Sequence, residues 1–302
     1  MPSVRANGLT LEYESLGDPA HPAIVLIMGL GMQLVGWPEE FCRTLAARGY
    51  RVVRFDNRDC GLSSRVPGRR WQNPLLLLAA VRLGLPVRAP YTLEDMARDT
   101  VGLMDALGIG NAHLVGVSMG GMIAQMVTAR FPERVLSLTS MLSSSGRPHP
   151  MPPKPEALRM FMHRPRRSAG REAIIDHIVE LFSVIGSPGY PTDRREMRSR
   201  ISGWVARAYD PRATVRQLLA VVVTGDRRPL LNTITVPTLV IHGADDPLVP
   251  LEEGRDTARN VRGATLLVID GMGHDLPNAL LPRLVDAIDR HCQGRPQSVV
   301  TA

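Results

Sequence analysis

Short apolar runs alternate with longer amphipathic stretches through the first half of the chain. Continuous apolar runs such as 23–28 predict strands that are covered on both faces, and apolar residues spaced three and four apart predict helices. The expected strands are 9–16, 23–28, 51–56, 112–117 and 134–141, and the expected helices are 38–48, 92–107 and 119–130. Strands that alternate with helices are typical of an α/β domain with a mostly parallel central sheet flanked by helices.

Local signals mark the ends of two of these helices. Thr92 is expected to cap one of them at its start, because Asp95 follows three residues later and can complete the cap. Gly49 and Gly108 each follow an expected helix, where glycine suits the C-terminal cap.

The pattern changes between residues 143 and 235. This stretch is rich in Pro, Arg and Met, and it offers helical segments but no convincing strand. An interruption of roughly 90 residues is too long for a connecting loop, and its ends lie beside strand ends where ligands bind in open α/β sheets. The expected helices here are 171–183, 193–209 and 213–224, followed by strands 237–242 and 264–269 and a closing helix 282–292. We therefore expect a core domain at 1–142 and 236–294, a helical cap (lid) inserted before the last strands at 143–235, and a flexible tail at 295–302.

Gly116-Val117-Ser118-Met119-Gly120 matches the G-x-S-x-G pattern at a junction between an expected strand and an expected helix. This context distinguishes a nucleophile turn from a glycine-rich turn with an incidental serine. A sharp turn lifts the Ser118 hydroxyl above the sheet, and glycine at 116 and 120 leaves room for that turn. The sequence therefore predicts Ser118 as a nucleophile.

A serine nucleophile needs a general base. Of the eight histidines, His274 lies in the loop after the last expected strand, where a base is expected to follow the nucleophile and the acid along the chain. His242 ends a strand and is the alternative to consider, whereas His113 begins its strand at the wrong end of the sheet.

The base in turn needs an acid that orients it, and two candidates are adjacent after strand 237–242. We favour Asp246, because Pro247 holds it in an extended backbone. Asp245 is expected to cap the turn instead. Ser118, Asp246 and His274 are thus the predicted catalytic triad.

An oxyanion hole requires two backbone amides beside the nucleophile. One is expected from Met119, directly after Ser118, and the other from the loop that follows the strand 23–28. Within that loop we favour the Leu30 amide, because Gly29 permits a turn that aims it inward.

The amino-acid composition limits the classes of molecule that the protein is expected to bind. The formal charge is +7, almost all of it from Arg, since Lys154 is the only lysine. The arginines are scattered, apart from clusters at 164–167 and 194–200. This distribution argues against binding of nucleic acid. The favoured interpretation is a solvated surface, and attraction of an anionic partner or a lipid surface is the less favoured one. Three cysteines without metal-binding spacing predict neither a disulfide framework nor a metal site. The absence of a signal-peptide-like start favours a cytoplasmic protein.

Several of these segments resemble α/β-hydrolase fold esterases, in particular the aclacinomycin methylesterase group and related bacterial esterase/lipase-like proteins. The resembling segments are Met28-Gly29-Leu30-Gly31, Gly36-Trp37-Pro38, residues 54–59, Gly61-Leu62-Ser63, 116–120, Asp246-Pro247 and Gly271-Met272-Gly273-His274. The resemblance implies ester hydrolysis by a Ser-His-Asp triad beneath a helical cap, without a cofactor, and a structural role for loop 56–63. The resemblance is weak across the expected cap, so it does not imply that this chain shares the anthracycline specificity of the methylesterase.

The sequence therefore predicts a carboxylesterase-type serine hydrolase that acts on a small to medium apolar ester through an acyl-enzyme. Alternatives on the same triad are thioester, lactone or C–C bond hydrolysis and cofactor-free perhydrolysis; a lipid-directed lipase and a non-enzymatic small-molecule receptor are further alternatives. Ser118 at the nucleophile position disfavours dehalogenases and epoxide hydrolases, which use a carboxylate there. The apolar run 75–85 and residues 160–162 are candidates for an acyl pocket, although ordinary packing is the simpler interpretation.

Overall fold

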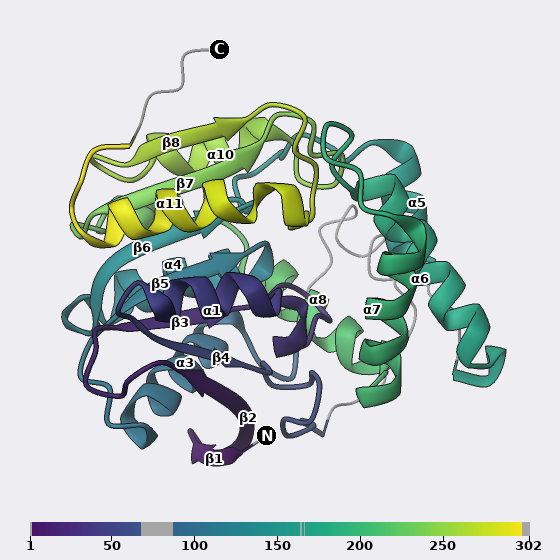
Figure 1. The fold of residues 1–302 in the computed structure, drawn as a ribbon, viewed down its shortest axis with the longest axis horizontal. Coiled ribbons are helices and arrows are strands. Elements are labelled where there is room, and N and C mark those ends of the chain that lie inside the picture. The colour runs from purple at the N-terminus through teal and green to yellow at the C-terminus, as the bar shows by residue number, and fades with distance from the viewer. Residues whose placement is uncertain (1, 68–86, 164, 166, 298–302) are drawn as a thin grey trace.

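The computed structural model describes residues 2–67, 87–163, 165 and 167–297. These residues form an eight-stranded sheet in the order β1-β2-β4-β3-β5-β6-β7-β8 (Figure 1). The strands are β1 (Ser3–Ala6), β2 (Leu9–Leu16), β3 (Ala23–Ile27), β4 (Arg51–Phe55), β5 (Ala112–Val117), β6 (Val135–Met141), β7 (Thr238–Gly243) and β8 (Thr265–Ile269). The predicted α/β architecture is confirmed.

The sheet is parallel except at one edge. β2 pairs antiparallel with β1 and β4, and all pairs from β4 to β8 are parallel. β3 has β4 on one side and β5 on the other, so the chain leaves β3 in one direction and later returns to its other side. A ligand crevice in an open parallel sheet forms at such a reversal, beyond the carboxyl ends of the strands. Here those ends are Ile27 and Val117.

Helices cover both faces of the sheet. Alternate residues of β3 face opposite sides, as the strand geometry requires: Val25 and Ile27 pack in one hydrophobic cluster, and Ile24 and Leu26 pack in the other. The first cluster includes α3 (Leu93–Ala106) and α4 (Met119–Arg130), and the second includes α1 (Glu39–Ala47) and α11 (Leu281–Cys292), which lie in front of the sheet in Figure 1. Among the described residues, α10 (Leu251–Arg259) is a further helix, and it lies between β7 and β8 along the chain.

Several expected elements coincide with the observed ones. The strands expected at 9–16 and 112–117 are β2 and β5, and the helix expected at 119–130 is α4. The capping box at the start of α3 is also confirmed: Asp95 N donates to Thr92 Oγ1 and Thr92 N donates to Asp95 Oδ2. The pattern of apolar residues did not predict β1, α10 or two helices between β6 and β7, α5 (Pro155–Met162) and α9 (Arg228–Leu231).

The described part of the segment between β6 and β7 contains helices and no strand. These helices are α5 (Pro155–Met162), α6 (Arg171–Ile185), α7 (Arg194–Arg207), α8 (Pro211–Thr224) and α9 (Arg228–Leu231), with a short 3-10 turn η3 (Arg167–Ala169). Figure 1 shows α5, α6 and α7 stacked beside one end of the sheet. The division into a core and a cap at 143–235 stays a prediction.

Two expectations fall on residues that the structure does not describe. The apolar run 75–85 lies outside the described residues, as do 298–302 of the expected tail. In the described part of the chain, no helix is both long and apolar enough to cross a membrane.

Candidate active site

Ser118 occupies the turn between β5 and α4 with a backbone that few side chains adopt. Its φ and ψ are 56° and −122°, a strained combination for a residue with a Cβ. The flanking glycines are required by contact: a Cβ on Gly116 would lie 2.2 Å from the Gly120 carbonyl oxygen, and one on Gly120 would lie 2.0 Å from the Ile27 carbonyl oxygen. The turn therefore depends on both predicted glycines.

The structure brings together the three side chains predicted as a triad. His274 Nε2 lies 3.1 Å from Ser118 Oγ, and His274 Nδ1 lies 2.7 Å from Asp246 Oδ2. The Asp246 side chain is fully buried and that of His274 is 9% exposed. Asp246 follows β7 and His274 follows β8, so the two loops meet Ser118 at the carboxyl edge of the sheet. The spacing suits proton transfer from the hydroxyl to the imidazole.

Asp246 is oriented by its own turn. Its Oδ1 accepts hydrogen bonds from the amides of Leu248 (2.9 Å) and Val249 (2.8 Å), which leaves Oδ2 directed at His274. The expectation that Asp245 caps this turn is wrong. Asp245 Oδ2 instead accepts from the Gly271 amide at 2.9 Å and so ties the turn to the loop that carries His274.

His242, the alternative base, is a buried core residue. Its Nε2 lies 2.8 Å from the Val249 carbonyl oxygen, and burial lowers the pKa of its imidazole. His113 is also buried, with Nδ1 2.8 Å from Ser137 Oγ, and burial lowers its pKa to about 4. Neither imidazole contacts Ser118.

The loop after β3 passes close to Ser118. A Cβ on Gly29 would lie 3.2 Å from Ser118 Cβ and 3.7 Å from its Oγ. Among the described residues, neither the Leu30 amide nor the Met119 amide donates a hydrogen bond to another protein group. Both amides are therefore available to an acceptor near Ser118, and their role as an oxyanion hole stays a prediction.

Side chains from distant segments hold this loop in place. Asn57 Nδ2 donates to the Met28 carbonyl (2.9 Å), and the Leu34 amide donates to Asp56 Oδ1 (2.7 Å). Gln217 of α8 accepts from the Gly31 amide at 2.7 Å. These partners could not be found from the sequence, because they lie 22 to 186 positions away from the groups that they contact.

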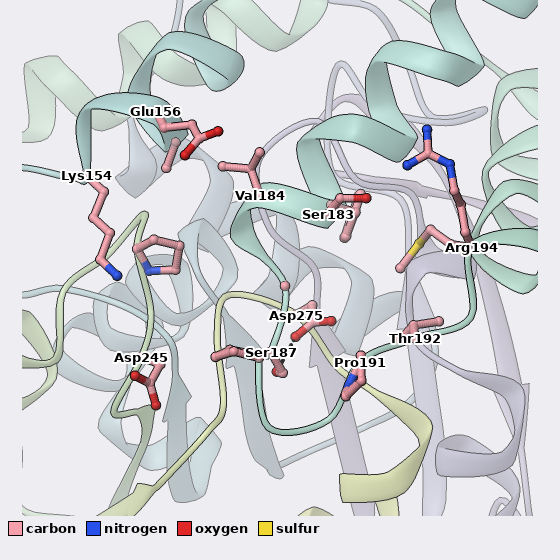
Figure 2. A pocket seen from close by; sticks show the side chains of 16 residues that line it. Lys154, Glu156, Ser183, Val184, Ser187, Pro191, Thr192, Arg194, Asp245 and Asp275 are labelled. Atoms are coloured by element: carbon pink, nitrogen blue, oxygen red, sulfur yellow. Dashed lines mark hydrogen bonds between the residues drawn. The ribbon is translucent and has the colours of Figure 1, made fainter.

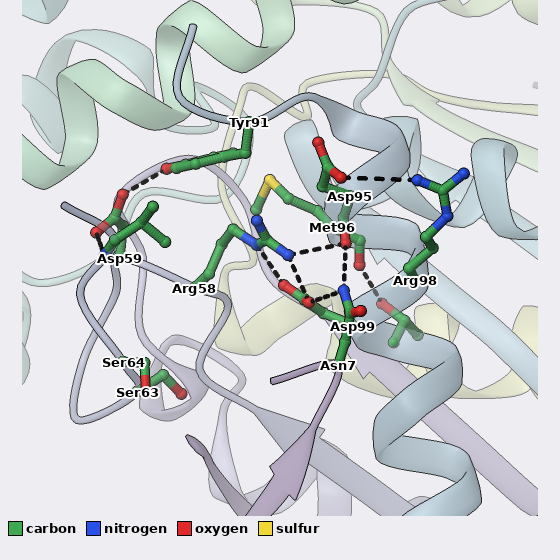
Figure 3. Close-up of polar contacts among 12 residues, drawn as sticks. Asn7, Arg58, Asp59, Ser63, Ser64, Tyr91, Asp95, Met96, Arg98 and Asp99 are labelled. Carbon is green, nitrogen blue, oxygen red and sulfur yellow. Dashed lines mark hydrogen bonds and ion pairs between the residues drawn. The ribbon is translucent and has the colours of Figure 1, made fainter. Parts of the chain in front are cut away.

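Loop 56–63 is held by ion pairs. Arg207 contacts Asp56 at 2.7 Å, and Arg216 contacts Asp59 at 2.6 Å. Asp59 also accepts from the Tyr91 hydroxyl, while Arg58 pairs with Asp99, which accepts from Asn7 (Figure 3). These contacts fit the structural role expected for this loop.

Two of the four arginines in the second cluster, Arg194 and Arg198, form ion pairs. Arg198 contacts Asp176 and Glu172 of α6, and Arg194 lies 3.5 Å from Glu180. Arg164 and Arg166 of the first cluster lie outside the described residues. Within the described ranges, no group of three or more His, Cys, Asp or Glu side chains could hold a metal ion.

Comparison with known proteins bears on the family and the fold of this chain. Residues 22–174 match the alpha/beta hydrolase fold family, and residues 213–287 match a TAP-like protein family. Rhodomycin D methylesterase DauP of Streptomyces sp. (strain C5) is 31% identical over 303 residues, which cover 94% of this chain and 95% of that protein. A 2-hydroxy-6-oxononadienedioate/2-hydroxy-6-oxononatrienedioate hydrolase of Burkholderia vietnamiensis is 28% identical, covering 88% of this chain and 85% of that protein.

A solved structure supports the fold independently. The meta-cleavage product hydrolase CumD from Pseudomonas fluorescens IP01 superposes with a TM-score of 0.71 at 20% identity, covering 97% of this chain and 98% of CumD. The family match and the methylesterase relative, together with the eight-stranded sheet, establish that this chain is a hydrolase of the α/β hydrolase fold family.

Proposed function

We propose that the protein is a carboxylic ester hydrolase that acts through Ser118, His274 and Asp246 by way of an acyl-enzyme. The observation that carries this proposal is the hydrogen-bonded series from Ser118 Oγ to His274 to Asp246, at 3.1 and 2.7 Å. Each member has the chemistry that its position demands, because a hydroxyl needs a base and an imidazole needs a carboxylate to hold its tautomer.

The reaction would proceed in two halves. Ser118 Oγ attacks the ester carbonyl carbon while His274 Nε2 takes its proton, and the amides of Leu30 and Met119 stabilise the oxyanion. Collapse of this intermediate breaks the ester C–O bond, and the alcohol leaves with the proton from His274. His274 then takes a proton from a water that attacks the acyl carbon. The bond between the acyl carbon and Ser118 Oγ breaks, the acid is released, and His274 returns the proton to Ser118 Oγ. Throughout, Asp246 accepts from His274 Nδ1 and stabilises the charged imidazolium.

The substrate class follows from the relatives. Rhodomycin D methylesterases at 30–31% identity over 94% of the chain support the hydrolysis of a methyl ester. The choice of a small to medium apolar ester comes from the sequence. Ester hydrolysis is therefore the proposal, and the alcohol and acyl groups remain general.

Other relatives favour two alternative reactions on the same residues, C–C bond hydrolysis and lactone hydrolysis. Hydrolases of 2-hydroxy-6-oxononadienedioate are 28% identical, and 3-oxoadipate enol-lactonase 2 of Acinetobacter baylyi is 25% identical. A panel of apolar methyl esters, lactones and vinylogous diketones would separate these activities. The ester proposal predicts the highest kcat/KM for a member of the ester group.

The direct kinetic test replaces the nucleophile. Ser118→Ala should lower the rate of p-nitrophenyl ester hydrolysis by about 10⁴-fold or more, because the attacking hydroxyl is lost. Ser183→Ala on α6 is a matched control, since its hydroxyl donates only within the helix, to the Val179 carbonyl at 3.0 Å. An unchanged rate in Ser118→Ala would reject the assignment.

A further inference from the structure

The loop that carries His274 lies against the end of α6. The His274 amide donates to the Ile185 carbonyl at 2.7 Å, and the Gly189 amide donates to the Gly271 carbonyl at 2.9 Å. The two backbones approach so closely that a Cβ on Gly273 would lie 2.2 Å from the Gly186 carbonyl oxygen. Segment 185–189 therefore supports loop 271–275 along its length.

One hydroxyl in this contact bonds both neighbours of His274. Ser187 Oγ accepts from the Gly273 amide at 2.9 Å and donates to Asp275 Oδ1 at 2.5 Å. Ser187 is 4% exposed and Asp275 is 8% exposed, so both hydrogen bonds lie in a largely buried part of the structure. Both residues line a cavity of about 440 Å³ between α5, α6 and the loops after β7 and β8 (Figure 2).

The His274 loop needs such support. The imidazole must keep Nε2 within reach of Ser118 and Nδ1 within reach of Asp246 at the same time, and a displacement of about 1 Å can cost about 100-fold in rate. The loop lies beyond β8 and contains two glycines, of which Gly271 has a φ of +74°. Glycine loses the most conformational freedom when it is fixed, so contacts from outside the loop must hold its conformation.

We propose that Ser187 is a positioning residue for the general base, and that it acts by holding the backbone of Gly273 and the side chain of Asp275 on either side of His274. The inference rests on the proposed function, since it assigns His274 the role of base. It also makes the segment between β6 and β7 a working part of the site, because the hydroxyl that holds the base comes from that segment.

The test compares three variants with the native protein on p-nitrophenyl esters. Ser187→Ala removes both hydrogen bonds and should lower kcat by about 10- to 100-fold with less than about threefold change in KM, because alignment matters most in the transition state. Ser187→Thr retains the hydroxyl beside a cavity that can take the added methyl, and should recover most of kcat. Ser183→Ala, four residues earlier and facing the same cavity, should keep kcat within about twofold.

A spectroscopic readout separates this inference from the proposed function. The low-field proton resonance of the His274–Asp246 hydrogen bond, assigned by its loss in His274→Gln, should weaken or shift in Ser187→Ala and return in Ser187→Thr. This signal does not depend on any substrate. If Ser118→Ala retained activity, the proposed ester reaction would fail while the resonance still tested Ser187.

The overturning results are equally specific. Full kcat and an unchanged resonance in Ser187→Ala would refute the positioning role. Should the alanine variant fail to fold, Ser187→Cys decides, because its thiol fills the space but is a weak hydrogen-bonding group. A folded Ser187→Cys protein with the native kcat and resonance would overturn the proposal, and a loss like that expected for alanine would support it.

Discussion

Individual side chains in the site were predictable where the chemistry is local. Ser118 was predicted from its motif. The glycines on either side of it are needed because a Cβ on Gly116 or Gly120 would lie only 2.2 or 2.0 Å from a backbone carbonyl oxygen. The roles of Asp245 and Asp246 were only half predictable. Pro247 favoured Asp246 as the acid that orients His274, but nothing in the sequence indicated that the same carboxylate also caps its own turn.

A matched pair of substitutions tests this division of roles. Asp246→Asn should lower kcat by about 10⁴-fold, because the amide can no longer hold the required imidazole tautomer or stabilise its charge. Asp245→Asn removes the negative charge but keeps an oxygen that can accept from the Gly271 amide, and we expect a loss of less than about tenfold. Steady-state kinetics of both variants on one ester would measure the contrast. Equal losses would contradict the assignment of Asp246.

At the scale of whole elements, periodicity succeeded for long buried segments and failed for short or polar ones. α10 was missed because its sequence, LEEGRDTAR, is almost entirely polar and contains a central glycine. Tertiary contact explains that glycine, since a Cβ on Gly254 would lie 2.4 Å from His242 Nδ1. β1 has only four residues, and its pairing with β2 rather than its own pattern makes it a strand.

The position of α8 leads to a prediction about the loop after β3. Gln217 accepts from the Gly31 amide and donates to the Arg58 carbonyl, at 2.7 and 2.8 Å, and it is fully buried. Gln217→Leu should therefore release the loop that carries the Leu30 amide and lower kcat about 10-fold or more with little change in KM, as expected for a contact used in the transition state. The control is Arg212→Ala, an exposed site on the same helix. A rise in KM alone would show that Gln217 serves substrate binding instead.

For the molecule as a whole, ion pairs join the segment between β6 and β7 to the rest of the chain. Arg207 and Arg216 reach the buried carboxylates of Asp56 and Asp59. A sequence pattern could predict that this segment is helical, but these pairings depend on how it folds back over the sheet. The same limit applies to Ser187 and Gln217, whose partners are set by three-dimensional contact.

Buried imidazoles set the expected acid sensitivity of the whole fold. Burial lowers the pKa of His113 to about 4, from 6.5, and also lowers the pKa of His242 and His291. Between these values the unfolded chain binds protons that the folded protein does not, so the free energy of unfolding falls as the pH falls from 6.5 toward 4. The contribution of one such histidine is at most about 1.4 kcal/mol per pH unit.

Urea unfolding between pH 6.5 and 4.5 measures this slope. His113→Asn should reduce the loss of unfolding free energy over this range relative to the native protein, even if it lowers stability at neutral pH. His21→Asn, at an exposed position, should leave the slope unchanged. A native slope retained in His113→Asn would count against a buried, neutral His113.

The most direct test of the central claim is to identify the residue that reacts covalently with a reagent for activated serines. The protein is treated with one equivalent of a fluorophosphonate, digested, and mapped by mass spectrometry. The account predicts a single adduct on the peptide that contains Ser118, no adduct in Ser118→Ala, and much slower labelling in His274→Gln and Asp246→Asn. An adduct on another residue, or labelling of Ser118 at the native rate without His274, would contradict it.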